Sequence, residues 1–431
     1  MVDAGLKRRR PYVAAAALAG LLAVIVLAVW LAWPRPVAAP LPEQDEIARF
    51  LARHWPQNLA PQGLAPVDSI TELASSLKPS DCGVCHADQL ADWSQALHSH
   101  TMGPGIQWQL RLMTQEEGNR CLFCHAPLAE QKALVALARG WPAAPAEPPP
   151  AYVPSDLADA GLVCANCHLR GRELFGPGSM VPEGNGVKLH GNSTASAAFE
   201  DSRFCARCHQ FPQDGPRTNG KLHEDTYEQW RAGASATRGE TCQSCHMPGR
   251  RHQWQGIHSP EMVRKALTTD LRVTAGDDGR LLARLRVTNS GAGHHFPTYM
   301  VPKAVVSLTL VDERGVARKR LAEYVIGWNI ETGLTGEIAD TRLAEGESVV
   351  VSGGFDAPRR TGWKVEARID VIPGEHYERI YTASLQQRDR LDAGTVTLLE
   401  EALRSTRAGR FEALRLQAPA SAVEPGAVPK P

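Results

Sequence analysis

The chain has 431 residues, which is long enough for two or three domains, and 43% of them are hydrophobic. Lys and Arg together number 47, and so do Asp and Glu, so the charge balance gives no case for a nucleic-acid partner. Aromatic residues make up only 6%, and 31 prolines with 37 glycines indicate that much of the chain forms loops.

An apolar run without charges extends from Tyr12 to Trp33, directly after the basic residues 7–10. This length suffices to cross a bilayer as a helix, and the preceding basic residues predict a cytoplasmic N-terminus. Residues 1–33 are therefore expected to form a single-pass anchor in the inner (cytoplasmic) membrane, with the bulk of the chain in the periplasm. The alternative is a cleaved signal peptide with small residues at 37–39, but signal apolar regions usually have about 7–15 residues.

Residues 34–77 read as a proline-rich stalk followed by a leading helix. The next segment, 78–264, contains five copies of the pattern C-x-x-C-H, and these copies use every cysteine in the chain. The copies are Cys82, Cys85 and His86; Cys121, Cys124 and His125; Cys164, Cys167 and His168; Cys205, Cys208 and His209; and Cys242, Cys245 and His246.

This pattern is the attachment signature of c-type haem. The two thiols bond to the vinyl groups on one edge of the porphyrin, and the histidine that follows binds the iron from below the ring. Zinc sites and redox-active dithiols are the alternatives, but zinc requires converging C-x-x-C pairs and does not require a histidine after each pair. Five copies therefore predict five covalently bound haem c groups, each with its own proximal histidine.

A low-spin haem needs a second strong axial ligand, and ten of the 15 histidines remain after the proximal ones. Their excess favours bis-histidine ligation. The candidates for the distal position are His98, His190, His252, His258 and His294. His100 and His223 are alternates, and His54 and His376 are expected at the surface.

After the last motif, apolar and polar residues alternate with a period of two, as in residues 281–287, 306–310 and 364–371. This alternation predicts half-buried strands and an antiparallel β-sandwich over 265–390. Residues 391–416 are expected to form a C-terminal helix, and 417–431 have the composition of a disordered tail. The predicted fold is α+β: a mostly helical and looped multihaem cytochrome domain followed by the sandwich, with one N-terminal transmembrane helix.

Three segments resemble the multihaem family named after cytochrome c-554 and cytochrome c-prime: 82–98, 204–211 and 226–248. The first places Trp93 and His98 at a set spacing after its motif, and Gly293–Thr298 resembles a loop of the β-domain found in exported members. The resemblance implies closely packed bis-histidine haems that pass electrons singly, with His98 as the distal ligand of a different haem. A fifth haem, the anchor and the sandwich depart from the tetrahaem type.

We therefore expect an electron-transfer protein, with no catalytic residues, that works between redox partners. Each haem adds two propionates, so the loaded protein becomes acidic and suits a basic periplasmic cytochrome or oxidoreductase. One alternative is a haem enzyme acting on a small nitrogen or sulfur species, which requires an open axial position. Another is a quinol dehydrogenase of the NapC/NirT type, although 48 residues separate Trp33 from Cys82 and the first haem of that type follows the membrane closely.

Overall fold

The computed structural model describes residues 45–63, 75–178, 193–276 and 278–422. The chain divides into two compact units, 1–49 and 50–431. The described residues of the first unit, 45–49, contain the start of helix α2 (Glu46–His54). The predicted membrane anchor at 1–33 lies outside the described residues. Within the described ranges, no helix combines the length and apolarity needed to cross a bilayer.

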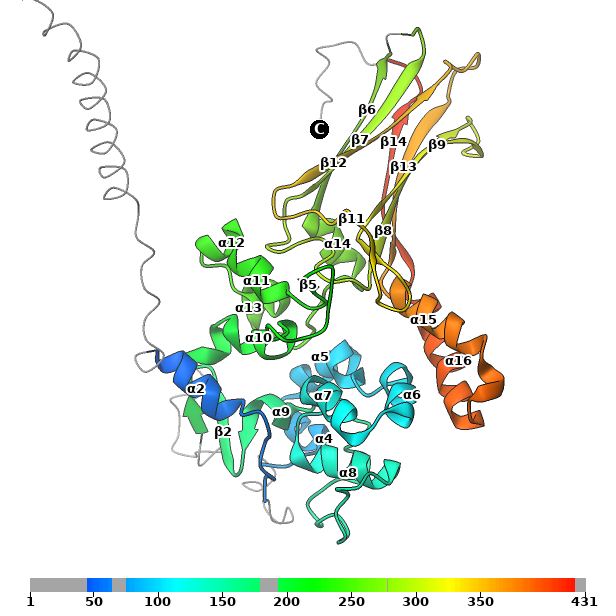
Figure 1. Cartoon of the computed structure of the whole chain (residues 1–431). Helices are drawn as coiled ribbons and strands as arrows, with labels where there is room; N and C mark the ends of the chain where they lie inside the picture. The colour runs from blue at the N-terminus through cyan, green and yellow to red at the C-terminus, as the bar shows by residue number, and fades with distance from the viewer. Residues whose placement is uncertain (1–44, 64–74, 179–192, 277, 423–431) are drawn as a thin grey trace, which may run out of the picture. The chain divides into compact units, whose positions relative to one another are not determined.

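The part of the chain that contains the cysteine motifs is built of short helices and turns (Figure 1). Its elements up to the fourth motif are α4 (Pro79–Gly83), α5 (Ala87–Gln95), η1 (Leu97–His100), α6 (Pro104–Leu112), α7 (Gln115–His125), α8 (Ala129–Arg139), α9 (Cys164–His168), β1 (Leu169–Arg170), β2 (Glu173–Gly176), β3 (Ser193–Ala195), η2 (Ala197–Glu200) and α10 (Arg203–His209). They continue with β4 (Arg217–Thr218), β5 (Lys221–Leu222), α11 (Thr226–Arg231), α12 (Ala234–Thr237), α13 (Cys242–His246), η3 (Pro248–Arg250) and α14 (Pro260–Ala266).

Local sequence signals set the ends of these helices. Proline occupies the first turn of α4 and α6, where its missing N–H leaves no intrahelical bond unmade. Thr114 and Glu117 form a reciprocal capping box at the start of α7. Gly140 ends α8 with φ of 62°, a left-handed conformation that glycine adopts without a steric penalty.

The second part is a sandwich of two antiparallel sheets, with strand orders β12-β7-β6 and β14-β13-β8-β9 (Figure 1). The strands are β6 (Leu267–Ala275), β7 (Leu281–Asn289), β8 (Lys303–Val311), β9 (Ala317–Ile326), β12 (Ser348–Phe355), β13 (Lys364–Ile372) and β14 (Phe411–Pro419), and a small sheet joins β10 (Trp328–Ile330) to β11 (Glu337–Asp340). The predicted α+β fold, with antiparallel strands after a helical part, is confirmed.

Alternating burial along the central strands explains the sandwich. Every second residue of β13, from Val365 to Val371, is buried against the opposite sheet, and β7 buries Leu281, Ala283, Leu285 and Val287 in the same way. The intervening arginines of β7 are exposed. A strand with one buried and one solvated face requires this period of two.

The C-terminal helix predicted over 391–416 is wrong after residue 408. Helix α16 (Ala393–Ala408) ends before Gly409, and β14 then pairs with β13 and places Leu416 opposite Ala367. Pairing with β13 therefore overrides the helical propensity of this segment. The range expected to be sandwich also contains a helix, α15 (Glu375–Leu385), and the turn η4 (Arg388–Arg390).

Helices α15 and α16 pack on α6 of the first part. Trp108 of α6 meets the edge of Tyr381 of α15, with ring centroids 6.3 Å apart. Arg111 of α6 forms a 2.7 Å ion pair with Asp392, whose side chain also caps α16 by accepting from the Thr395 N–H. These hydrogen bonds from Thr395, followed by the Arg111 contact, lower the pKa of Asp392 to about 2.

Asp392→Asn should lower the melting temperature at pH 6, because the neutral amide loses the favourable charge of the carboxylate. The lowered pKa means that the contribution of Asp392 is complete above its ordinary pKa of 3.8 and disappears as the pH falls toward 2. The difference between the two proteins should therefore shrink over this interval in thermal scans. A difference that stays constant from pH 6 to pH 2 contradicts the assignment.

Candidate haem-binding site

Each cysteine motif lies on or beside a single helical turn. The third and fifth motifs form α9 and α13, and the second and fourth end α7 and α10. In the first motif, the N–H of His86 donates to the carbonyl of Cys82 at 3.0 Å, as in a helix. Residues three apart on a helical turn are neighbours, so both thiols of each motif face the same side.

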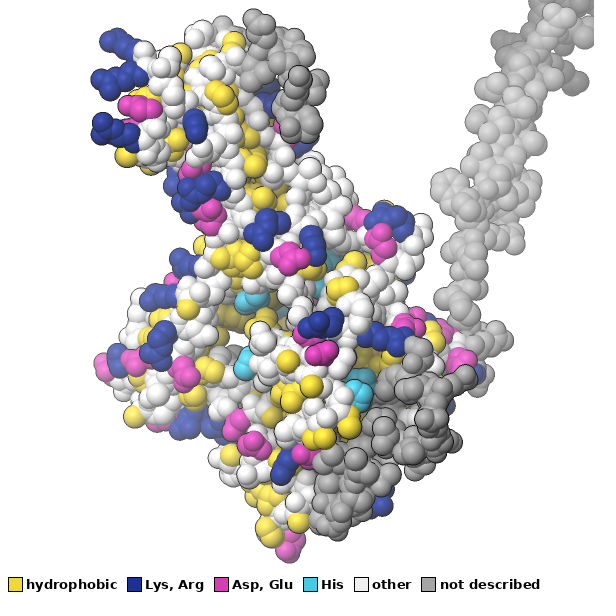
Figure 2. Space-filling view, turned by 180° about the vertical axis from the view of Figure 1, so that it is seen from behind, with side chains coloured by type: hydrophobic (Ala, Val, Ile, Leu, Met, Phe, Trp, Pro, Cys, Tyr) yellow, Lys and Arg dark blue, Asp and Glu magenta, His cyan; other side chains and the backbone are white. Residues whose placement is uncertain are grey.

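All five motifs face one shared cavity of about 3860 Å³. Every one of the ten cysteines and all five predicted proximal histidines line it. Figure 2 shows histidine and apolar side chains around the hollow in this part of the surface. One fifth of the volume is about 770 Å³, which falls within the range of roughly 300–1,000 Å³ typical of a single small-molecule site.

The cysteines are not arranged as zinc ligands. All ten are free of disulfides, and the described residues contain no cluster of three or more His, Cys, Asp or Glu that could hold a metal ion by themselves. A zinc site would need such a cluster. Five pairs of thiols, each followed by a histidine that faces the cavity, fit covalently attached haem.

Three proximal histidines are oriented by backbone carbonyls. The Nδ1 atoms of His125, His168 and His246 lie 2.7, 2.8 and 2.6 Å from the carbonyl oxygens of Thr101, Phe175 and Gln255, listed in the same order. A carbonyl at Nδ1 places the proton there and leaves Nε2 with its lone pair. Each ring can therefore present Nε2 to a metal in the cavity.

Three of the five motif histidines, His168, His209 and His246, each face a second histidine across the cavity. The ring centroids of His209 and His98 are 6.3 Å apart, those of His168 and His252 are 6.2 Å apart, and those of His246 and His294 are 6.3 Å apart. A histidine nitrogen bonds a first-row metal such as zinc at about 2.0–2.1 Å, so two imidazoles that share one ion have ring centres separated by roughly 6 Å. The three observed separations match this value.

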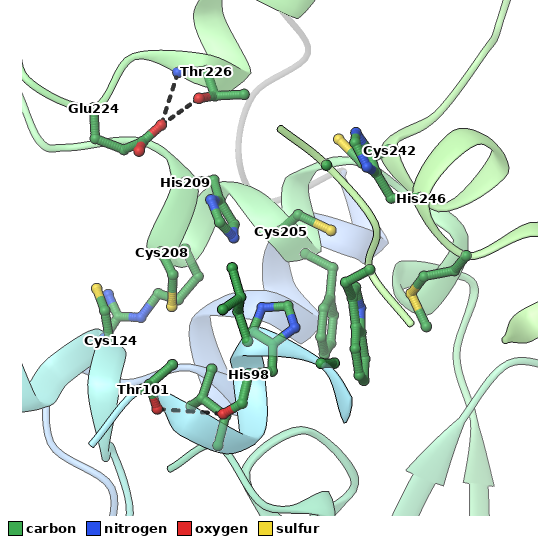
Figure 3. Close-up of a pocket in the computed structure, with 18 of the residues that line it drawn as sticks. His98, Thr101, Cys124, Cys205, Cys208, His209, Glu224, Thr226, Cys242 and His246 are labelled. Carbon is green, nitrogen blue, oxygen red and sulfur yellow. Dashed lines mark hydrogen bonds between the residues drawn. The ribbon is translucent and has the colours of Figure 1, made fainter. Parts of the chain in front are cut away.

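Figure 3 shows His98, from η1, pointing toward His209, which ends α10. Burial lowers the pKa of His98 to about 3 and those of His168 and His294 to about 4. These rings are therefore neutral at physiological pH, which is the form that binds metals.

The other predicted distal residues are placed differently. His258 lines the cavity, but among the described residues no imidazole faces it at the separation seen in the three pairs. His190 lies outside the described residues. Of the two alternates, His100 is exposed and does not line the cavity, whereas His223 lines it with Nε2 2.8 Å from Thr218 Oγ1.

The prediction that His54 and His376 lie at the surface is wrong. His54 is 3% exposed because it stacks on Phe50 and bonds through Nε2 to the carbonyl of Cys167 at 2.8 Å. His376 is fully buried on α15, where its Nδ1 accepts from Arg379 at 2.9 Å. Only the tertiary packing reveals this burial.

The turns that carry different motifs also pack on one another. Helix α4 contacts α9, and α10 contacts α7. The Cys242 N–H at the start of α13 donates to Ser202 Oγ, directly before α10, at 3.0 Å. Figure 3 shows Cys124 of the second motif and Cys242 of the fifth on either side of Cys205, Cys208 and His209 of the fourth.

Trp254 is a site residue that the sequence analysis missed. It packs edge-on against His98 at 4.5 Å and against His252 at 5.0 Å, and thereby separates two facing pairs. Its φ of 42° is unusual for a bulky residue and identifies a constrained backbone. A tryptophan between two candidate histidines is the sequence signal that could have found it.

The search against protein-family models found no match, and no curated protein matches the sequence. A solved structure does match: a penta-haem cytochrome c552 from Thermochromatium tepidum, with a TM-score of 0.53 and 19% sequence identity. The alignment covers 78% of this chain and 97% of that chain. This chain shares the fold of a multihaem c-type cytochrome. The prediction of a multihaem cytochrome is confirmed at the level of the fold.

The segment that bears His252 is held by Asp92 of α5, which is 4% exposed. Its carboxylate accepts from Nε and Nη2 of Arg251 at 2.6 Å each, and from the His252 N–H and Gln253 Nε2 at 3.0 Å each. The bond with Arg251 is the main cause that lowers the pKa of Asp92 to about 2.

Asp92→Asn should destabilise this segment, because a buried hydrogen bond to a charged group contributes about 1.5–3 kcal/mol. We expect a lower melting temperature and a changed low-spin EPR signal from one haem of the loaded protein. Asp88→Asn, one turn earlier on the exposed side of α5, is the matched control and should change neither. Equal effects of the two substitutions would show that Asp92 does not position the segment.

Proposed function

We propose that this chain is an exported, membrane-anchored pentahaem c-type cytochrome that transfers electrons between redox partners. Each haem, when bound, supplies an iron that takes up and releases one electron. The observation that supports the proposal best is the convergence of all ten cysteines on one cavity, together with three histidine pairs 6.2–6.3 Å apart. Two strong axial ligands favour electron transfer over catalysis because they leave no position for a substrate.

The histidine pairs support a distal ligand for each of three haems. His98 serves the haem of the fourth motif, His252 that of the third, and His294 that of the fifth. Two of these ligands follow a motif other than the one they serve: His98 follows the first motif, and His252 follows the fifth. The third, His294, comes from the connection between β7 and β8. The sandwich thus completes the coordination of a haem attached to the first part of the chain.

The packing of the motif-bearing turns supports an order for the pathway. Helix α4 packs on α9, so the first haem would lie beside the third. Helix α10 packs on α7, and Ser202 directly before α10 accepts from the Cys242 N–H at 3.0 Å, so the fourth haem would lie beside the second and the fifth. The fourth haem would then be the junction of these three.

We infer the location and the partner from the sequence and its charge. The apolar run at 12–33 supports an inner-membrane anchor with the haems in the periplasm. The resemblance of the motifs supports a place for the chain in the cytochrome c-554 and c-prime group. The propionates of five haems make an otherwise neutral chain acidic, so a basic redox protein is the expected partner. Such a charge difference accelerates association at low salt.

Expression in a host that matures c-type cytochromes should yield protein with the mass of the polypeptide plus five haems, and its band on a denaturing gel should stain for haem. The stain persists because thioether bonds retain the haem after the chain unfolds. Apoprotein mass in such a host would overturn the proposal.

His98→Ala should convert one haem of the loaded protein from low-spin to high-spin, because a strong axial ligand is lost. His100→Ala, two residues away on the same 3-10 turn but exposed and outside the cavity, is the control and should leave the spectrum unchanged. EPR and near-infrared spectra of the oxidised proteins measure the change. An unchanged low-spin signal in His98→Ala excludes the assignment of that ligand.

A further inference from the structure

The three facing histidine pairs have nearly the same separation, but their rings cross at different angles. The two ring planes lie 10° apart in the pair of the fifth motif and 37° apart in that of the third. In the pair of the fourth motif, the planes of His98 and His209 lie 77° apart. The fourth motif thus has the one pair of the three whose imidazoles are close to perpendicular.

The distal members of the pairs also differ in what orients their rings. The Nδ1 atoms of His252 and His294 each lie 2.9 Å from a carbonyl oxygen, that of Arg250 and that of His295, respectively. A hydrogen bond of this kind fixes the ring plane of a ligating histidine. The Nδ1 atom of His98 is buried and has no hydrogen-bond partner among the described residues. The plane of the His98 ring is therefore set by packing.

Trp254 supplies this packing. Its indole meets the His98 imidazole at an angle of 85° with the ring centroids 4.5 Å apart, at the near end of the range for edge-to-face contacts. The backbone of His98 is also held, because its carbonyl accepts from the Leu162 N–H at 2.8 Å. With its backbone fixed and the indole against one side, the imidazole cannot turn toward the plane of His209 unless Trp254 moves.

The backbone on both sides of Trp254 is anchored, which keeps the indole in place. On one side, Asp92 accepts from the N–H of His252 and from the side chain of Gln253, at 3.0 Å each. On the other side, the carbonyl of Gln255 lies 2.6 Å from Nδ1 of His246. The φ of 42° at Trp254 is costly for a bulky side chain, and such a conformation persists only where the surroundings determine it.

We propose that Trp254 is a positioning residue that holds the His98 ring across the His209 ring, and that this crossing makes the fourth haem electronically different from the third and the fifth. This inference rests on the proposed function, since it requires bound haems with these pairs as axial ligands. Trp254 also meets His252 at 5.0 Å, but the carbonyl of Arg250 orients that ring independently.

The physical basis is the symmetry of the bonding between imidazole and iron. Two parallel imidazoles donate into the same iron d orbital, which separates it in energy from its partner and stabilises the ferric state. Two crossed imidazoles donate into both orbitals alike and leave them nearly equal in energy. A low-spin ferric iron with nearly equal orbitals gives a strongly anisotropic EPR signal with a high maximal g value, and its reduction potential is raised.

The EPR spectrum of the oxidised, fully loaded protein provides the first test. We expect a strongly anisotropic low-spin signal that disappears in His98→Ala, which assigns it to the fourth haem. A rhombic signal lost in His98→Ala instead would overturn the inference and leave electron transfer by bis-histidine haems standing. A haem count below five would count against the proposed function.

Trp254→Leu tests the positioning role. The His98 ring should then turn toward the plane of His209, so the maximal g value of the fourth haem and its reduction potential should both fall while the iron stays low-spin. Trp254→Phe keeps an aromatic edge and should retain most of the wild-type signal. Identical spectra of wild type and Trp254→Leu would exclude the role of Trp254. If Trp254→Leu does not take up five haems, Trp254→Met serves in its place with the same expected outcomes.

Trp363→Leu is the matched control, because it removes a partly buried indole from the edge of the sandwich core. It should lower the melting temperature without changing the EPR signal of any haem. A shift of the fourth-haem signal in Trp363→Leu equal to that in Trp254→Leu would show that general destabilisation causes the change, and the inference would fail.

Discussion

Ten thiols and their histidines must reach one shared interior, and this constraint shapes the whole first part of the molecule. No single apolar core fills the space between these helices, because the shared cavity of about 3860 Å³ occupies it. The buried apolar clusters of this part are accordingly small, one around Leu128 and Leu157 and another around Leu110 and Leu122. Short helices that end at a motif histidine satisfy the constraint, because each turn needs only to aim two sulfurs and one ring.

The sandwich has a core of its own. This core is contiguous and apolar, so it can hold the loop between β7 and β8 in place. Asn289 at the end of β7 donates to the carbonyls of His294 and Leu343 and accepts from the Ala292 N–H. Glu345 reaches the first part of the chain, where it accepts from Ser235 at 2.9 Å and from Arg238. The sandwich thus holds the loop that bears His294 beside the part of the chain that contains the cysteine motifs.

Local features of this fold could be predicted from the sequence, and relations between distant segments could not. The motifs are predictable because their chemistry depends on three residues at fixed spacing, and the strands because alternation is a local pattern. The pairing of His252 with His168 was not predictable, because the contact depends on how two turns 84 residues apart fold back on one another. The burial of His54 and the pairing of β14 with β13 are also tertiary effects.

The contacts of the fourth motif bear on how many electrons the proposed protein could deliver at once. In a linear series, charge leaves at the far end at the pace of the slowest step. A branched set with α10 at its centre would instead let electrons enter by several arms and leave through one exit. Such a protein would store electrons from a slow, single-electron donor and release several of them in quick succession to one acceptor.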